Sequence, residues 1–248
     1  MKKTVILLGD SITQGLGSKK INFTAELQKL LGDCYHVENM ALTGTTIQYA
    51  EEILPAILEK KPQYVVIVYG NVDAQIRPSR SGHIFKHIPK RFQKNGMLMP
   101  RPFYSHVLYK RIVQRMENAL RYFYSKLIYA IDGSEQWVDV DTFTKVYRKV
   151  VKKLKDADIR VIACSTVALD DCLFPGSKAE YEKFNASIRE IASAENIQYI
   201  GLCDTLNDAI QIKGWNAVYC YDHFHPNEEG YGIIAKQIAN EICGESMQ

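Results

Sequence analysis

The sequence has no long hydrophobic run, no metal-binding cysteine pattern and no large excess of charge of either sign. After the basic start at Met1, the first apolar run ends at Leu8, which is too short for a signal-peptide core or a membrane span. The six cysteines form no C-x-x-C pair, and none stands near a histidine at zinc-site spacing. We therefore expect free thiols, no metal and a cytoplasmic protein. A formal net charge of +3 is too small by itself to indicate a nucleic-acid partner.

Phosphate-binding motifs are also absent. The glycine that a P-loop needs five residues after Gly9 is replaced by Gln14, and Lys20 stands where the third glycine of G-x-G-x-x-G would follow Gly15 and Gly17. The chain has no internal repeats and no low-complexity tracts. No cofactor is expected, and a flavin or nucleotide bound to the sheet is an alternative that a yellow protein or a copurified nucleotide would reveal.

Strand and helix patterns alternate along a chain of 248 residues, 46% of them hydrophobic, which is enough for one domain over residues 1–248. The expected strands are 4–8, 36–39, 64–69, 160–164 and 198–202. The expected helices are 23–31, 46–59 with a kink or restart at Pro55, 140–155, 179–194 and 227–243. This alternation predicts a parallel sheet of about five strands with helices on both faces, and functional sites at the carboxyl ends of the strands.

One segment, residues 77–131, interrupts this alternation. It holds twelve Lys or Arg residues and a single acid, Glu117, so it carries about +11 and the remainder about −8 (3 minus 11). Its proline-containing first part reads as loop, and 105–127 reads as a basic amphipathic helix. It could draw an anionic substrate, an acidic membrane surface or a polyanion towards the site. Alternatively, it could be a solvated helix whose aromatic residues cover the sheet or form a dimer contact.

A serine at the end of the first strand raises the question of a nucleophile. Ser11 would need a base, because a serine hydroxyl reacts poorly at neutral pH. His225 stands where a loop enters the last predicted helix, and Asp222, three residues earlier, can orient its imidazole. His223 has no acid at that offset and is the weaker candidate. Asp10 is expected to brace the loop.

These residues resemble the SGNH, or GDSL, hydrolases. The shared pattern comprises Gly-Asp-Ser ending at Ser11, the glycine of "ALTGTT", a Gly-and-Asn block after the third strand and D-x-x-H-P ending at Pro226. The resemblance spans residues 4–230 outside the basic insertion. It implies a three-layer α/β/α fold like flavodoxin, with Ser11 as nucleophile, His225 as general base and acid, and Asp222 orienting His225. It also implies an oxyanion hole formed by the N–H groups of Ser11 and Gly44.

The third block departs from the family pattern. Where the family reads G-x-N-D, this chain has Gly70-Asn71-Val72-Asp73, with valine at the position of the oxyanion-hole asparagine. Either Asn71 serves from a shifted backbone, or the side-chain donor is missing and the rate falls by about 10² to 10³. Asp73 is expected to be local scaffolding.

The sequence therefore predicts a serine esterase or deacylase that forms an acyl-serine intermediate. The expected substrate is a small ester, which could be anionic or linked to a carbohydrate. An acyltransferase on the same site is an alternative. So is a catalytically impaired binding module for an anionic glycan or a protein. No nucleic-acid partner and no membrane span are expected, and the sequence does not specify an oligomeric state.

Overall fold

The computed structural model describes residues 2–18, 23–94 and 96–245, and Lys20 lies outside them. Its main sheet is parallel and five-stranded, with the order β2 (Tyr35–Asn39), β1 (Lys3–Gly9), β3 (Tyr64–Val68), β6 (Arg160–Cys164) and β7 (Gln198–Ile200). The order 2-1-3-6-7 reverses direction beside β1, so a crevice opens at the carboxyl ends of β1 and β3. This confirms the predicted flavodoxin-like sheet, and each predicted strand is present with small shifts of its ends.

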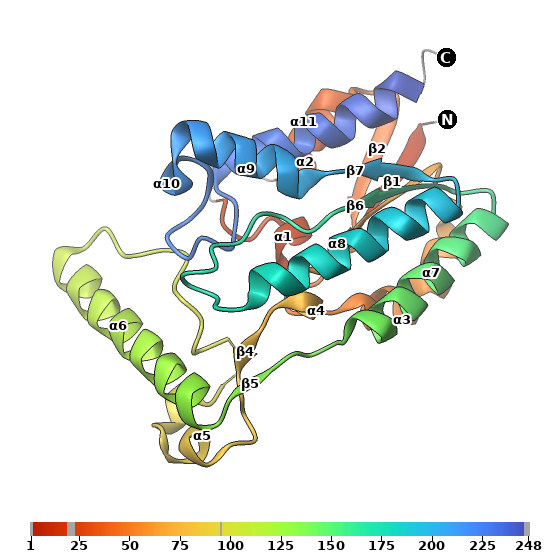
Figure 1. Cartoon of the computed structure of the whole chain (residues 1–248). Helices are drawn as coiled ribbons and strands as arrows, with labels where there is room; N and C mark the ends of the chain where they lie inside the picture. Colours follow the sequence, from red (N-terminus) through yellow and green to blue (C-terminus); the bar gives the residue numbers. More distant parts are fainter. Residues whose placement is uncertain (1, 19–22, 95, 246–248) are drawn as a thin grey trace.

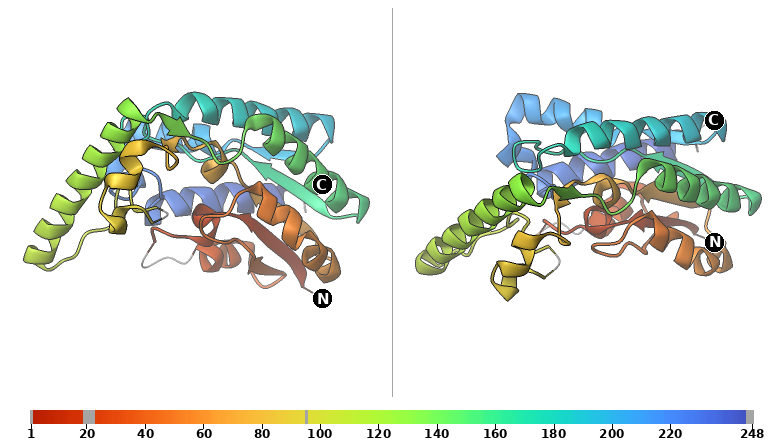
Figure 2. Two further views of the ribbon diagram at one scale, coloured as in Figure 1. Left: turned by 90° about the horizontal axis from the view of Figure 1, so that it is seen from below. Right: turned by 60° about the horizontal axis from the view of Figure 1, so that its bottom comes forward.

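Helices cover both faces of this sheet (Figures 1 and 2). Alternate residues of β1 face opposite ways: Val5 and Leu7 pack with α2 and α11, whereas Ile6 and Leu8 pack with α3, α7 and α8. The helices of the body are α1 (Ser11–Gln14), α2 (Phe23–Leu31), α3 (Ile47–Lys60), α4 (Asn71–Ala74), α7 (Val140–Asp156), α8 (Ser177–Ala194), α9 (Leu202–Lys213), α10 (Trp215–Val218) and α11 (Glu228–Glu245).

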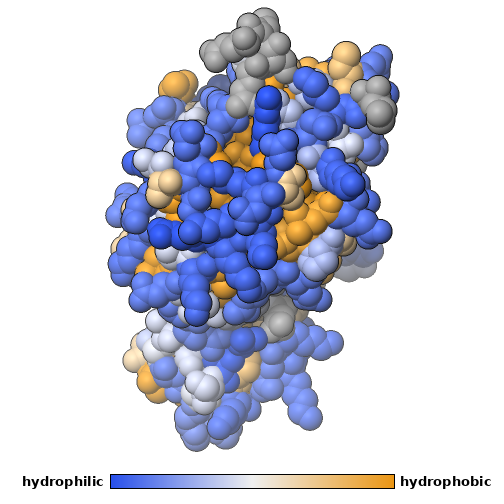
Figure 3. Space-filling view, turned by 90° about the vertical axis from the view of Figure 1, so that its right-hand side faces the viewer, coloured by the Kyte–Doolittle hydropathy of each residue, from blue (hydrophilic) through white to orange (hydrophobic). Residues whose placement is uncertain are grey.

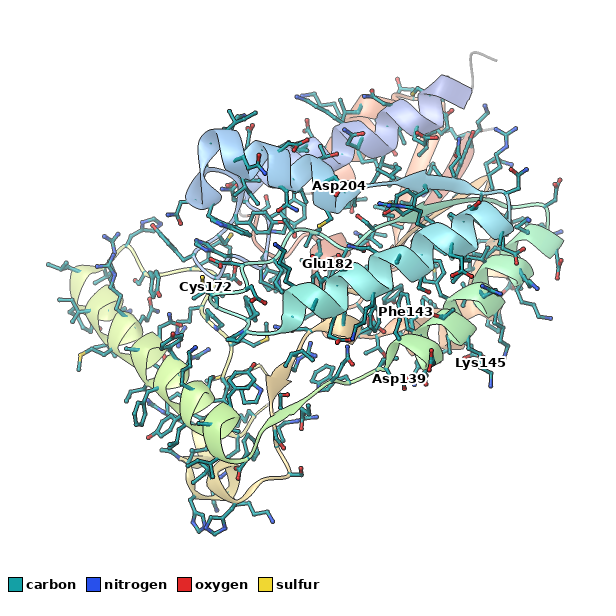
Figure 4. All side chains as sticks on the ribbon, viewed as in Figure 1. Asp139, Phe143, Lys145, Cys172, Glu182 and Asp204 are labelled. Atoms are coloured by element: carbon teal, nitrogen blue, oxygen red, sulfur yellow. The ribbon has the colours of Figure 1, made fainter. Side chains whose placement is uncertain are left out.

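The start of α7 illustrates how local sequence determines a helix. Asp139 accepts a hydrogen bond from the Thr142 N–H at 2.8 Å and so caps the helix. Phe143 points towards α8 and is fully buried, whereas Lys145 lies on the outer side (Figure 4). Surface side chains on the right-hand side of the molecule are mainly hydrophilic, with smaller apolar areas between them (Figure 3).

Two helical features differ from the sequence expectation. Pro55 lies inside α3, so the helix does not restart there, and its buried positions (Ile47, Ala50, Leu54 and Ile57) keep one face on the sheet. The last predicted strand ends at Ile200, and α9 and α10 follow it where no helix was expected. The sequence of α9 is rich in Asp, Asn, Thr and Ile, which are weak helix formers.

The basic insertion extends from the body as a separate arm at the lower left of Figure 1. Two short antiparallel strands, β4 (Arg77–Pro78) and β5 (Ser134–Glu135), join at its base. Its first part is not all loop: it contains α5 (His83–His87), whose first N–H groups bond to the Asp132 carboxylate, and a 3₁₀ turn at Lys90–Phe92. The predicted long helix is present as α6 (Leu108–Ile131).

Candidate active site

Ser11 lies at the carboxyl end of β1, as predicted, and is the first residue of α1. Asp10 caps this short helix by accepting the Ile12 N–H at 2.9 Å. Gly9 is required before it, because a Cβ there would lie 2.8 Å from the carbonyl oxygen of Val68 and closer still to Thr13. The backbone therefore turns sharply and holds the Ser11 hydroxyl at the edge of the sheet.

The structure brings His225 and Asp222 to this serine. The Ser11 Oγ lies 3.0 Å from His225 Nε2, and His225 Nδ1 lies 2.6 Å from Asp222 Oδ2. The other carboxylate oxygen of Asp222 accepts the backbone N–H groups of Phe224 and His225 at 3.2 and 3.1 Å. An ionised carboxylate can accept a hydrogen bond but cannot donate one. His225 Nδ1 therefore carries the proton that bonds to Asp222, and Nε2 offers its lone pair to the Ser11 hydroxyl.

The loop that carries Asp222 and His225 is held by backbone bonds at both ends. The Cys220 N–H donates to the His225 carbonyl at 2.9 Å, and the Asn227 N–H donates to the Val218 carbonyl at 3.0 Å. Ser11, Asp222 and His225 are all buried, which strengthens the hydrogen bonds between them.

Gly44 stands in the turn after β2 with a φ of +76°, a conformation that favours glycine. The neighbouring Thr43 N–H donates to Gln14 of α1 at 3.1 Å, which fixes this turn beside Ser11. Gly44 and Ser11 line the same cavity. Within the described residues, neither of their N–H groups donates to another protein atom, so both can serve an external acceptor.

Asn71 does not reach this cavity, contrary to the suggestion that it replaces the missing asparagine. Its side-chain NH₂ donates to Asp10 at 3.3 Å, its side-chain oxygen accepts the Val167 N–H at 2.8 Å, and the residue is fully buried. Val72, the next residue of α4, lines the cavity instead. Asn71 therefore connects β1 to the loop after β6, and the cavity wall here is apolar.

Two buried carboxyl groups stand behind the site. Burial raises the pKa of Asp10 to about 6, against the opposing effect of its bonds to Ile12 and Asn71. Burial, together with the nearby charge of Asp10, raises the pKa of Asp73 to about 7. Asp73 accepts the backbone N–H groups of Ile47 and Gly70 at 2.8 and 3.1 Å. Both acids thus brace the loops after β1, β2 and β3, as expected from the sequence.

These raised pKa values predict a pH-dependent stability. Below the unfolded pKa of 3.8 the Asp73 carboxyl is protonated in both states. Between this value and about 7 the unfolded state loses its proton first, so the free energy of unfolding falls as pH rises. Between pH 4 and 7, the free energy of unfolding of the parent should fall by about 2 to 4 kcal/mol more than that of Asp73→Asn. Urea unfolding at each pH measures this difference. Parallel pH curves for the two proteins would contradict this assignment.

A cavity of about 480 Å³ opens on Ser11 and His225, and the basic insertion forms its far wall. The lining residues from the insertion include Phe85, Phe92, Lys94, Leu98, Met99 and Arg121. Arg77 stacks on Trp137 with its guanidinium carbon 4.0 Å from the ring centre, and donates to the carbonyls of Val72 and Gln75. Arg80 pairs with Glu135 at 2.6 Å. The site is therefore enclosed by apolar and cationic side chains together.

His223 has an acid partner that the sequence analysis missed. Its Nδ1 lies 2.7 Å from Asp170 Oδ2, and its ring stacks on Trp215 with ring centres 5.0 Å apart. Its Nε2 faces the side-chain oxygen of Asn216 at 3.4 Å. Asp170 stands 53 residues earlier in the chain, so no short motif could indicate the pair. His223 fastens the loop of Asp222 and His225 to the loop after β6.

Among residues 2–18, 23–94 and 96–245, no three His, Cys, Asp or Glu side chains gather in a way that could hold a metal ion. None of the helices described there has the length and apolar character needed to cross a membrane. None of the six cysteines, all of which lie in these ranges, forms a disulfide.

Serine, histidine and aspartate side chains are hydrogen-bonded to one another at the strand ends of a parallel sheet. The fold and this site define a class of protein: the carboxylic ester hydrolases with a flavodoxin-like sheet. The model of the GDSL-like lipase/acylhydrolase family matches residues 7–233. The chain therefore belongs to this family. No curated protein sequence matches it significantly.

Solved structures share the fold at low sequence identity. An acetylxylan esterase from Geobacillus stearothermophilus is 16% identical, with a TM-score of 0.63 over 97% of this chain and 94% of that one. A lipase/acylhydrolase from Enterococcus faecalis is 18% identical, with a TM-score of 0.62 over 98% and 96%. A putative GDSL-like lipase from Parabacteroides merdae is 15% identical, with a TM-score of 0.61 over 98% and 97%.

Proposed function

We propose that the chain, acting as one domain, is a serine esterase in which Ser11, His225 and Asp222 form the catalytic triad. The observation that carries this proposal is the pair of hydrogen bonds at 3.0 and 2.6 Å that joins the three side chains inside the cavity. Further support comes from the acetylxylan esterase, whose catalytic mutants change a serine, an aspartate and a histidine three positions after that aspartate. Asp222 and His225 have the same spacing.

In the proposed reaction, Ser11 Oγ attacks the ester carbonyl carbon while its proton passes to His225 Nε2. The tetrahedral intermediate places its oxyanion against the N–H groups of Ser11 and Gly44. It collapses when the alcohol leaves with the proton from Nε2, and the acyl group stays on Ser11. Water then attacks the acyl carbon and gives a proton to Nε2. The second tetrahedral intermediate collapses when the bond to Ser11 Oγ breaks, Nε2 returns the proton to that oxygen, and the acid is released. Asp222 keeps the proton of Nδ1 in place throughout and stabilises the imidazolium.

This oxyanion hole has two backbone donors and no amide at the position of the family asparagine, because Val72 lines the cavity there and Asn71 bonds elsewhere. Gln75 also lines the cavity, and its buried side-chain amide has no hydrogen-bond partner among the described residues. Each well-placed donor contributes about 3 to 4 kcal/mol to transition-state stabilisation. We therefore propose an enzyme that is slower by about 10² to 10³ than one with a third donor, or that acts on an activated ester.

The proposed substrate is a small ester whose acyl or alcohol part fits the cavity of about 480 Å³. The indole of Trp137 and the cationic side chains around it suit a carbohydrate-linked or anionic group. By its name, the acetylxylan esterase supports the carbohydrate alternative. Six cysteines without a disulfide among the described residues support a cytoplasmic location.

Labelling with an active-site fluorophosphonate tests the proposal. The parent should gain the mass of one phosphonyl group on the peptide that contains Ser11, whereas Ser11→Ala should gain none. Ser79→Ala, which removes another buried serine hydroxyl, is the matched control and should label like the parent. An unlabelled but folded parent would indicate a binding module that lacks a competent nucleophile. Product analysis with an added alcohol would separate hydrolysis from acyl transfer.

A further inference from the structure

The long helix of the insertion, α6, presents its polar face to the protein. Arg121 is buried and donates to the Met99 carbonyl at 3.1 Å, and Ser125 donates to the Leu98 carbonyl at 3.0 Å. The side-chain oxygen of Asn118 accepts the Arg101 N–H at 2.9 Å. Further along the same face, Glu117 pairs with the Arg101 guanidinium. Near its carboxyl end, a small cluster around Ile128 also attaches the helix to the arm.

The opposite face of α6 is apolar and exposed. Its large side chains recur every three or four residues, and between 43% and 70% of each is accessible to solvent; they include Leu108, Ile112, Val113, Met116, Leu120 and Phe123. Side chains project from α6 away from the body of the described structure (Figure 4). A helix that packs on a core buries its apolar face, whereas α6 exposes its apolar face. This leaves a continuous apolar stripe that no described element covers.

The charges beside this stripe indicate what covers it. Lys110, Arg115 and Lys126 are exposed on α6, and the insertion as a whole carries about +11. Pairing α6 with α6 of a second copy would bring two such charges together, which opposes association. An anionic lipid surface satisfies both features, because its headgroups attract the cations while the acyl boundary accepts the apolar side chains.

We propose that α6 lies in the plane of an anionic phospholipid bilayer, with its apolar stripe at the headgroup–acyl boundary. This inference goes beyond the proposed esterase function and does not depend on it. The helix would rest on the bilayer without crossing it, in agreement with the absence of a membrane-spanning helix among the described residues. Since the insertion also walls the cavity, docking would place the site close to the lipid surface.

Vesicle cosedimentation tests this proposal on the full chain. The parent should bind vesicles of equal amounts of phosphatidylcholine and phosphatidylglycerol at least tenfold more tightly than pure phosphatidylcholine, and salt should weaken the binding. The combined changes Ile112→Ser, Met116→Ser and Phe123→Ser should lower binding at least tenfold and leave turnover of a soluble ester unchanged. Ile212→Ser, at an 82% exposed position of α9, is the matched control and should bind like the parent.

Three results would overturn the proposal. These are unchanged binding by the triple variant, equal binding of the parent to neutral and anionic vesicles, and a dimer of the parent in analytical ultracentrifugation that the triple variant does not form. The dimer would show that a second copy covers the stripe. If the triple variant fails to fold, Phe123→Trp gives an independent measurement, because indole emission should shift to shorter wavelength on anionic vesicles. An unshifted emission would count against docking.

Discussion

Replacing Ser11 by alanine should lower kcat/KM for p-nitrophenyl acetate by a factor of about 10⁴ or more. The change removes the proposed nucleophile, the hydroxyl oxygen that lies 3.0 Å from His225 Nε2. The loss should appear in kcat, because the proposed substrate cavity stays intact. Far-UV circular dichroism and the thermal midpoint should match those of the parent, since one buried oxygen is lost and no charge.

His225→Ala should reduce the rate by a similar factor, and the double variant Ser11→Ala/His225→Ala should be little slower than either single variant. Residues that act as one unit give losses that do not add. His36→Ala, at an exposed position of β2, is the matched control and should keep parental activity. Losses that multiply in the double variant would show that the two residues act independently, against a shared proton transfer.

The second large effect is expected for Asp222→Asn, with a loss of about 10⁴ in kcat. Two backbone N–H groups, from Phe224 and His225, bond to one oxygen of Asp222 and will hold the oxygen of an asparagine in that place. The new NH₂ group then faces His225 Nδ1, which can only accept from it. The proton moves to Nε2, and the imidazole can no longer take the proton of Ser11.

Because the volume of the side chain barely changes, Asp222→Asn should fold normally and still bind substrate. KM should stay within a few fold of the parental value while kcat falls. Asp170→Asn is the comparison, because it alters the same kind of carboxylate–imidazole pair at His223, outside the reacting atoms. It should cost far less activity. A full rate in Asp222→Asn would show that this carboxylate does not set the tautomer of His225.

The alternation of strands and helices, together with the order of the motifs, was sufficient to predict the sheet and the meeting of Ser11 with His225. Strand ends in a parallel sheet share one edge, so residues far apart in sequence could be assigned to one site. The direction of the Asn71 side chain could not be predicted, because it depends on a hydrogen bond from the Val167 N–H, which lies in another loop. The partner of His223 was missed for the same reason.

The sequence also predicted that the insertion holds a basic amphipathic helix, but not which side of it meets the protein. Periodicity defines two faces, and only tertiary contacts decide between them. Here the bonds of Arg121 and Ser125 to the preceding segment attach the polar side, so the aromatic residues of α6 do not cover the sheet. Short insertion helices and α9 were missed because their residue types carry weak helical preference.

Ser11 and His225 are separated by 214 positions, and this distance affects the chain while it is being synthesised. Ribosomes release a polypeptide from its amino end, so β1 can pair with β3 long before the loop of His225 emerges. During that interval the serine hydroxyl has no base beside it. Under the proposed mechanism, the nascent protein therefore cannot hydrolyse esters until the loop of His225 has left the ribosome.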